Sequence, residues 1–373
     1  MNRRYIIIGA LLVASTSGAL FFYTSTTANF EPKKRNNLVG AVLFLTGPQA
    51  SLGKEVQRGI ELAKEDVKDT HNINLAIEDS KDDPATAIAA INRLKVKNPD
   101  IYIITGDVVT LRSRPVLEQF KIPALATVAA GPGVTSGSKW IFRVFITAES
   151  QAKAIANYAT RIGFKKIGIL AVNNEFGSTM ISTFKNIFDP SRSRIVASET
   201  YDVTEVSPRL QVAKILASKP EAIFVTGFGD GYAASIRQVR EQGFKGEILS
   251  DAGLSVPYFR AVTGKASEGA VFAAPVFDET LSDSRALSFT RRYKERFRET
   301  PSYIAAYAYD AFQIASKAIA GTTNDPATVR KRLLAEKFEG LLNKTYKFAD
   351  NGEANDFIVL KTIRNGQVKP LVD

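Results

Sequence analysis

The chain has 373 residues, of which 45% are hydrophobic and 23% are charged, a mix typical of globular proteins with about two domains of ordinary size. It contains no cysteine, which excludes disulfides, thiolate metal sites, iron–sulfur clusters, a cysteine nucleophile and a lipid attached through cysteine. The one histidine, His71, lies in a polar turn and excludes a multi-histidine metal site. The net charge is +11, but acidic residues are interspersed among the basic ones. This distribution indicates a solvated basic surface and no nucleic-acid partner.

The N-terminus has the pattern of an export segment. Arg3 and Arg4 precede an apolar stretch at residues 5–23, and small and polar residues then lead to Ala28. This order is typical of a secretory signal peptide cleaved after a small residue. The apolar stretch is also nearly long enough to span a bilayer, so residues 1–28 are predicted to be either a cleaved signal or an anchor that contacts the membrane. The protein is expected to be periplasmic or otherwise extracytoplasmic, and without cysteine it is not a lipoprotein.

Beyond a polar spacer at residues 29–37, predicted strands alternate with predicted helices. Residues 38–45 form an almost continuous apolar run, which is typical of a strand buried on both faces of a parallel sheet. From Gly53 onward, apolar side chains recur at helical spacing. A further helix is predicted at 84–96, and further strands are predicted at 73–78, 101–105, 124–129, 166–172, 195–200, 222–226, 247–250 and 269–276.

This alternation predicts an α/β fold with right-handed crossovers, and about ten strands are too many for one compact sheet. We therefore expect two doubly wound parallel-sheet lobes joined by a hinge. Residues 131–139 are the most linker-like stretch, which places a boundary near residue 147. Three helices (283–297, 303–320 and 326–337) and two short strands near Tyr346 and Phe357 are predicted to follow. Lobe 1 is predicted to comprise residues 38–147 plus 277–337, and lobe 2 residues 148–276 plus 338–373.

Two glycine-rich turns imitate nucleotide-binding motifs, and neither keeps the full pattern. In residues 47–54 five residues separate the glycines instead of four, and Glu55 stands where a phosphate loop has the Ser or Thr that holds magnesium. In residues 227–232 a tyrosine replaces the third glycine of a dinucleotide fingerprint, and its bulk obstructs close packing of helix and strand. Paired carboxylates such as Asp82 and Asp83 are typical of helix N-termini. The sequence therefore predicts neither an enzyme nor a bound cofactor.

Small, hydroxyl and glycine residues gather at the ends of several predicted strands. In open parallel sheets the carboxyl ends of the strands form the ligand crevice, and helix N-termini there offer backbone donors. Phe176 and Phe228 follow two of these ends and are expected to form apolar walls of a small-molecule pocket. The strand ends concerned are residues 46–48, 105–107, 127–133, 173–174 and 226–227.

A series of short motifs runs through the chain in a characteristic order. They lie at residues 38–48, 58–63, 79–85, 103–106, 122–123, 174–177, 236–244 and 303–310. In order and spacing this series resembles the periplasmic leucine/isoleucine/valine-binding family over about residues 38–373. The resemblance implies a type I substrate-binding protein of ABC importers, with two doubly wound lobes, three crossing strands and a ligand held between the lobes.

The resemblance also implies positions for the ligand-binding residues. The family's serine that binds the ligand carboxylate is matched by Thr110, which keeps the hydroxyl. The next binding loop falls on Ala129 and Gly131, where a backbone carbonyl and amide remain available in principle. The family's aromatic walls fall on Leu52, Phe176 and Phe228.

One position departs from the family pattern. The acidic residue that holds the ligand ammonium falls on Ala252, beside Asp251. An uncompensated ammonium in a closed cleft is costly, so either Asp251 takes this role through a one-residue shift or the ligand is not an α-amino acid. Arg112 and Arg114 are either exposed surface or a feature that favours a more anionic ligand.

Together these inferences predict a binding protein that captures a small solute between two lobes by a hinge motion. Its expected partners are that small-molecule ligand, an amino acid or a related amphipathic carboxylate, and the permease of an ABC importer. An alternative uses the same fold as a membrane-associated ligand sensor that passes a signal to a receptor or kinase. An uncleaved N-terminal anchor would favour this alternative.

Overall fold

The structure is a computed structural model, and the residues that it describes are 37–68, 72–188, 194–277, 283–322, 325–342, 345–355 and 357–371. The predicted export segment at residues 1–28, the spacer up to residue 36 and His71 lie outside the described residues. Within the described ranges, no helix combines the length and the apolar composition that crossing a membrane requires.

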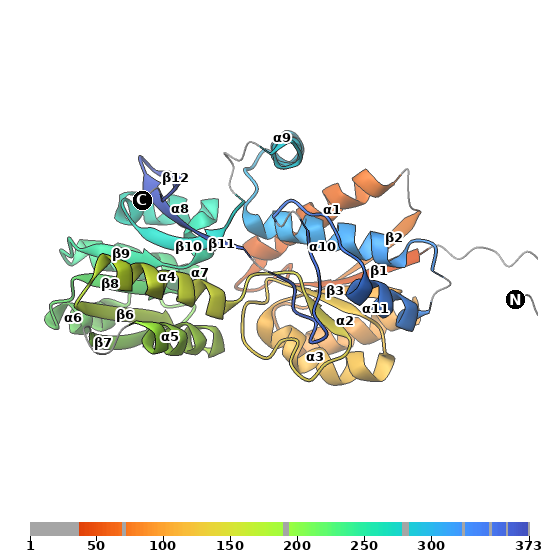
Figure 1. The fold of residues 1–373 in the computed structure, drawn as a ribbon, viewed down its shortest axis with the longest axis horizontal. Helices are drawn as coiled ribbons and strands as arrows, with labels where there is room; N and C mark the ends of the chain where they lie inside the picture. Colours follow the sequence, from red (N-terminus) through yellow and green to blue (C-terminus); the bar gives the residue numbers. More distant parts are fainter. Residues whose placement is uncertain are drawn as a thin grey trace, which may run out of the picture. The chain divides into compact units, whose positions relative to one another are not determined.

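The first sheet has five parallel strands among the described residues, in the order β2-β1-β3-β4-β5. Figure 1 labels β1, β2 and β3 of this sheet. Its strands are β1 (Asn37–Leu43), β2 (Ile73–Asp79), β3 (Ile101–Thr105), β4 (Ala124–Thr127) and β5 (Ile141–Arg143). The helices between them are α1 (Ala50–Val67), α2 (Pro84–Val96) and α3 (Asp107–Phe120). Three later helices return to this part of the fold, namely α9 (Ser284–Phe297), α10 (Tyr303–Ile319) and α11 (Pro326–Ala335).

Helices cover both faces of the first sheet, because neighbouring residues of a strand point to opposite sides. Ala41 and Ile103 belong to the apolar core that contains α1 and α10. Val42 and Ile104 belong to a separate cluster with α2 and α3. All four side chains are fully buried, which explains why these strands read as continuous apolar runs.

The second sheet has seven strands among the described residues, in the order β12-β11-β10-β9-β8-β6-β7. Its strands are β6 (Lys166–Val172), β7 (Arg194–Tyr201), β8 (Ala222–Thr226), β9 (Glu247–Ser250), β10 (Val271–Pro275), β11 (Ile358–Arg364) and β12 (Gln367–Pro370). Its helices are α4 (Ala148–Ile162), α5 (Glu175–Ile187), α6 (Arg209–Ala217), α7 (Gly229–Glu241) and α8 (Pro257–Thr263), with short 3-10 turns η1 (Ala252–Ser255) and η2 (Gly264–Ser267).

The predicted strands and helices are confirmed up to α11, with bounds that agree within a few residues. Of the two strands predicted after it, the one near Phe357 corresponds to β11, and the one near Tyr346 is wrong. Tyr346 forms only an isolated bridge with Phe338. The last two strands are β11, which is antiparallel to β10, and β12, which is antiparallel to β11, so the second sheet is not parallel throughout. Asn365 and Gly366 join them with φ angles of 54° and 71°, which an Asn-Gly hairpin turn adopts at low cost.

Residues 346–354 contact the first sheet, although the sequence-based division assigns them to the second lobe. The backbone N–H of Arg143 donates to the Gly352 carbonyl at 2.8 Å, and its guanidinium pairs with Glu353 at 2.9 Å. The rings of Phe142 and Phe348 lie 5.3 Å apart. The other predicted lobe boundaries stay a prediction, and these contacts place the last crossing to the second sheet just before β11.

Candidate ligand-binding site

A cavity of about 400 Å³ is lined by the strand ends of both sheets. Its walls come from the segments after β1, β2, β3 and β4 of the first sheet and after β6, β7, β8 and β9 of the second. This is the edge at which parallel sheets form ligand crevices. The volume falls within the range of small-molecule sites.

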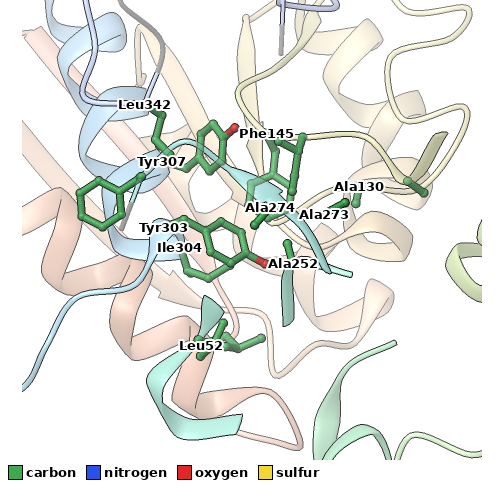
Figure 2. Close-up of a cluster of buried hydrophobic side chains, with 14 of the residues drawn as sticks. Leu52, Ala130, Phe145, Ala252, Ala273, Ala274, Tyr303, Ile304, Tyr307 and Leu342 are labelled. Atoms are coloured by element: carbon green, nitrogen blue, oxygen red, sulfur yellow. The ribbon is translucent and has the colours of Figure 1, made fainter. Parts of the chain in front are cut away.

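Aromatic rings form much of the apolar lining. Phe176 and Phe228 line the cavity with ring centroids 6.0 Å apart in an edge-on arrangement. The ring centroid of Phe145, on the segment that leaves the first sheet, lies 5.9 Å from the ring centroid of Tyr303 at the start of α10. Figure 2 shows these two rings in one buried cluster with Leu52, which also lines the cavity. The predicted walls at Leu52, Phe176 and Phe228 therefore line one cavity, and their contact with a ligand stays a prediction.

The start of α5 shows how the local sequence positions one wall. The Asn174 side chain caps the helix by accepting the Gly177 backbone N–H at 3.0 Å. At Gly177 a Cβ atom would lie 1.9 Å from the Val172 carbonyl oxygen, so only glycine allows the helix to start this close to β6. The tight turn places Phe176 at the cavity with 7% of its surface exposed.

Asp251 lines the cavity but is occupied within the protein. It is 2% exposed, and one of its oxygens accepts hydrogen bonds from the Thr226 hydroxyl and the Gly227 amide, both at 2.6 Å. The other oxygen accepts the Gly253 amide at 2.8 Å. Burial raises the pKa of Asp251 to about 6, against the lowering effect of these bonds. The carboxylate thus ties together the ends of β8 and β9, and its predicted role as an ammonium partner stays a prediction.

Three predicted site residues do not belong to the cavity lining. Thr110 is fully buried on α3, and its hydroxyl has no hydrogen-bond partner among the described residues. The Ala129 carbonyl accepts from the Arg143 guanidinium at 2.7 Å. The Gly131 amide donates to an Asp107 carboxylate oxygen at 2.7 Å. The carbonyl and the amide that the resemblance offered to a ligand are therefore engaged within the protein.

The cations near Thr110 do not reach the cavity either. Arg112 is exposed, and Arg114 donates to the Gly133 carbonyl. Neither residue is part of the cavity lining, which favours the reading of both as surface.

The sequence reasoning missed most of the carboxylates that line the cavity. Asp82 was interpreted as a helix N-terminal charge, but Asp83 caps α2 by accepting the Thr86 amide at 2.7 Å, and Asp82 lines the cavity. The signal that was available is position, because each of these carboxylates follows closely after a strand. The lining carboxylates are Asp82, Asp107, Glu175, Asp202 and Asp251.

Asp107 is half-buried and keeps one carboxylate oxygen available. One carboxylate oxygen accepts the Gly131 amide, and the other has no partner among the described residues. Burial raises the pKa of Asp107 to about 6, and the neighbouring charges of Glu175 and Asp82 also raise it. The Gly131 bond and the charge of Arg143 act in the opposite direction.

Two features of this lining bear on what it can bind. In the part of the chain that the structure describes, no three Asp, Glu or His side chains are arranged to hold a metal ion. The described lining also contains no Lys, Arg or His. Its chemistry is that of an apolar, aromatic pocket with carboxylates.

Comparisons with known proteins agree with this architecture. The profile described as periplasmic binding protein matches residues 38–367. The chain belongs to this periplasmic binding protein family. The leucine-, isoleucine-, valine-, threonine-, and alanine-binding protein of Pseudomonas aeruginosa is 24% identical over 307 residues, covering 79% of this chain and 81% of that protein. A Leu/Ile/Val-binding protein homolog of Brucella suis has the same identity and coverage.

Solved structures of periplasmic binding proteins share the fold. A leucine-binding protein from Thermotoga maritima superposes with a TM-score of 0.80 at 24% identity, covering 90% of this chain and 98% of that one. A solute-binding protein of an ABC transporter from R. palustris, in complex with benzoate, gives 0.82 at 19% identity, with coverages of 90% and 96%. The predicted family and the two-lobed α/β fold are confirmed, and the family consists of extracytoplasmic solute-binding proteins rather than enzymes.

Proposed function

We propose that this periplasmic binding protein captures a small amphipathic solute in the cavity between its two sheets and delivers it to the permease of an ABC importer. The observation that carries the proposal is the cavity itself, which lies at the strand ends of both sheets and has aromatic rings on its walls. Relatives that are named as solute-binding proteins of ABC transporters support the delivery step.

The ligand's apolar part is the better supported part of its chemistry. The sequence-based expectation is an amino acid or a related amphipathic carboxylate, and similar proteins include one named for amino acids and one in complex with benzoate. The rings of Phe176 and Phe228 suit the apolar body of either class. A ligand carboxylate, in contrast, finds no cationic side chain among the described lining residues.

Thermal unfolding of the full-length protein tests the capture step. Bound solute is first removed by partial unfolding, and the protein is then heated with amino acids, amides, ureas, small carboxylates and small amines. A ligand at about 100 times its dissociation constant adds about 2.7 kcal/mol to the unfolding free energy, which raises the melting temperature visibly. Stabilisation by none of these solutes contradicts capture of an amphipathic solute.

The delivery step is tested with the ligand in hand. We expect ATP-dependent uptake of that ligand into vesicles that contain the permease, and only when this protein is present. Tight ligand binding without any uptake in the presence of the permease would contradict delivery and favour the sensor alternative.

A further inference from the structure

The cavity is acidic although the protein is basic. The chain as a whole carries a net charge of +11, yet every ionisable acid–base side chain in the described lining, apart from Tyr303, is a carboxylate. The composition of the chain would favour the opposite charge. The acidic lining is therefore a local property of the site.

Some of these carboxylates repel one another across the cavity. Asp82 and Asp107 follow strands of the first sheet, whereas Glu175 begins α5 beside the second sheet. The charges of both Glu175 and Asp82 act on Asp107 and disfavour its ionised form. Like charges at close range in a partly buried site cost free energy, and a positive charge placed among them turns that cost into attraction.

Resting on the proposed function, we propose that the solute is an organic cation, a protonated amine or a quaternary ammonium with an apolar body. Its positive charge lies among Asp107, Asp82 and Glu175. Its apolar body lies against the rings of Phe176 and Phe228, whose faces also attract cations.

Asp107 is the strongest candidate for the direct partner of that charge. Its second carboxylate oxygen has no partner among the described residues, whereas both oxygens of Asp251 are occupied by the loops that they join. Glu175 is exposed at the first position of α5, and Asp202 is exposed after β7. Asp107 is half-buried and is therefore a more desolvated acceptor than Glu175 or Asp202, and Glu175 adds a weaker, screened attraction. Asp82 is also half-buried, and one of its oxygens accepts the Gln49 side-chain amide at 2.6 Å.

Other ligand classes fit less well. A divalent metal is disfavoured because the described carboxylates do not converge on one point. The helix N-termini of α3 and α5 favour anions in general, but Asp107 and Glu175 occupy their first turns and offset that partial charge. The Arg143 guanidinium, whose charge acts on Asp107, is 2% exposed and is bonded to the Ala129 carbonyl and to Glu353.

Two matched sets of probes separate charge from shape. One set is 3-methylbutylamine, leucine and 4-methylpentanoate, and the other is 2-phenylethylamine, phenylalanine and 3-phenylpropanoate. Within each set the apolar body is shared and only the charged end changes. We expect thermal unfolding and calorimetry of the full-length protein to show the tightest binding for the amine and the weakest for the carboxylate.

Each result has a distinct meaning. Tighter binding of leucine, phenylalanine or either carboxylate than of the matching amine overturns the cationic ligand and leaves solute capture standing. Binding of no probe from either set overturns the cationic ligand, and solute capture is overturned as well only if the wider panel also fails to stabilise the protein. Stabilisation by MgCl2 alone at the same ionic strength, with no effect of the amines, assigns the carboxylates to a metal and also overturns the inference.

Carboxamide variants locate the charge. We expect Asp107→Asn to weaken amine binding about 10- to 100-fold and Glu175→Gln to weaken it about 2- to 5-fold, because the Glu175 side chain is exposed. Carboxylate probes should bind these variants as well as, or better than, the unchanged protein. The matched control is Glu149→Gln, since Glu149 is an exposed residue in the first turn of α4 that does not line the cavity. An equal loss in this control would overturn the assignment to the cavity.

Discussion

The two walls of the cavity use the same type of side chain for different purposes. On the wall of the first sheet, Asp107 is bonded through one oxygen only and keeps the other available. On the wall of the second sheet, both oxygens of Asp251 accept hydrogen bonds from three donors in its own loops. The rings of Phe176 and Phe228 provide the contact surface of this wall. Burial raises the pKa of both aspartates to about 6. The raised pKa is common to both aspartates, and they differ in the number of their hydrogen bonds within the protein.

The largest expected effect is a loss of protein stability when Asp251, on the wall of the second sheet, is replaced. Asp251→Ala leaves the Thr226 hydroxyl and the Gly227 and Gly253 amides buried without their acceptor, and we expect a loss of about 3 kcal/mol or more in the free energy of unfolding. Urea denaturation measures it. Asp350→Ala, at an exposed aspartate whose side chain makes no hydrogen bond among the described residues, is the control and should unfold at nearly the unchanged urea concentration. A midpoint for Asp251→Ala equal to that of the control would show that Asp251 does not hold this wall.

Removing an aromatic wall should affect all probes alike. Phe228→Ala takes away apolar contact area, so we expect the affinities for the amine, the amino acid and the carboxylate of a matched set to fall by a similar factor, about 10-fold. Calorimetric titration measures the three values. A loss of affinity for only one of the three probes would contradict the assignment of apolar contact to this wall, because Phe228 would then act on the charged end of the probe.

Ionisation of Asp107, on the wall of the first sheet, should make the affinity for an amine depend on pH. Asp107, with a pKa of about 6, faces the Gly131 amide and the charges of Arg143, Asp82 and Glu175. As the pH rises from 5 to 7 its ionised fraction grows about 10-fold, and the affinity for an amine should rise by about that factor. Calorimetry at several pH values checks this rise, and Asp107→Asn should flatten it. A rise that persists unchanged in this variant would point to another group.

The free energy of unfolding of the ligand-free protein should change in the opposite direction, over an overlapping range of pH from about 4 to 6. The pKa of Asp107 is raised in the folded protein, so the folded state binds the proton more tightly than the unfolded state does. Its contribution to stability is complete below the ordinary value near 4 and is lost as the pH rises through 6. Asp251 contributes with the same sign, so the comparison with Asp107→Asn isolates the part that belongs to the first wall.

The smallest expected effect is at Thr110. Its hydroxyl is buried and has no partner among the described residues, so Thr110→Val should leave ligand affinity within about 2-fold and stability unchanged or higher by up to about 1 kcal/mol. Calorimetry and urea denaturation measure the two quantities. A loss of affinity above about 10-fold would restore Thr110 to the ligand contacts that the family resemblance implies.

The sequence was sufficient for the fold because strands buried on both faces are apolar throughout and are easily separated from amphipathic helices. The antiparallel end of the second sheet was missed, although the Asn365-Gly366 dipeptide is a strong hairpin signal. Phe176 and Phe228 were placed at the cavity because side chains that follow the strands of a parallel sheet lie at this edge, whereas Asp251 was placed there through the family resemblance.

Site properties that depend on distant partners were not visible in the sequence. The free oxygen of Asp107 is defined by its bond to Gly131, a residue 24 positions later in the chain. Thr110 matches a family motif, but α3 already begins at Asp107, and Thr110 lies on a buried face of its first turn. Motif matching locates a residue in the chain, whereas its exposure depends on where the helix begins.

The late return of α10 to α1 has a consequence for how the protein is made. Glu55 on α1 accepts a hydrogen bond from Ser302, which stands 247 residues later at the start of α10. Asn37 at the start of β1 donates to the Ile319 carbonyl at the other end of α10, across 282 residues. Contacts between such distant segments form slowly, because the entropy of closing the intervening loop is lost before the contact is gained. One face of the first sheet is therefore covered by α1 alone until the ribosome has produced most of the chain, and the part that α10 later covers is open to chaperones until then.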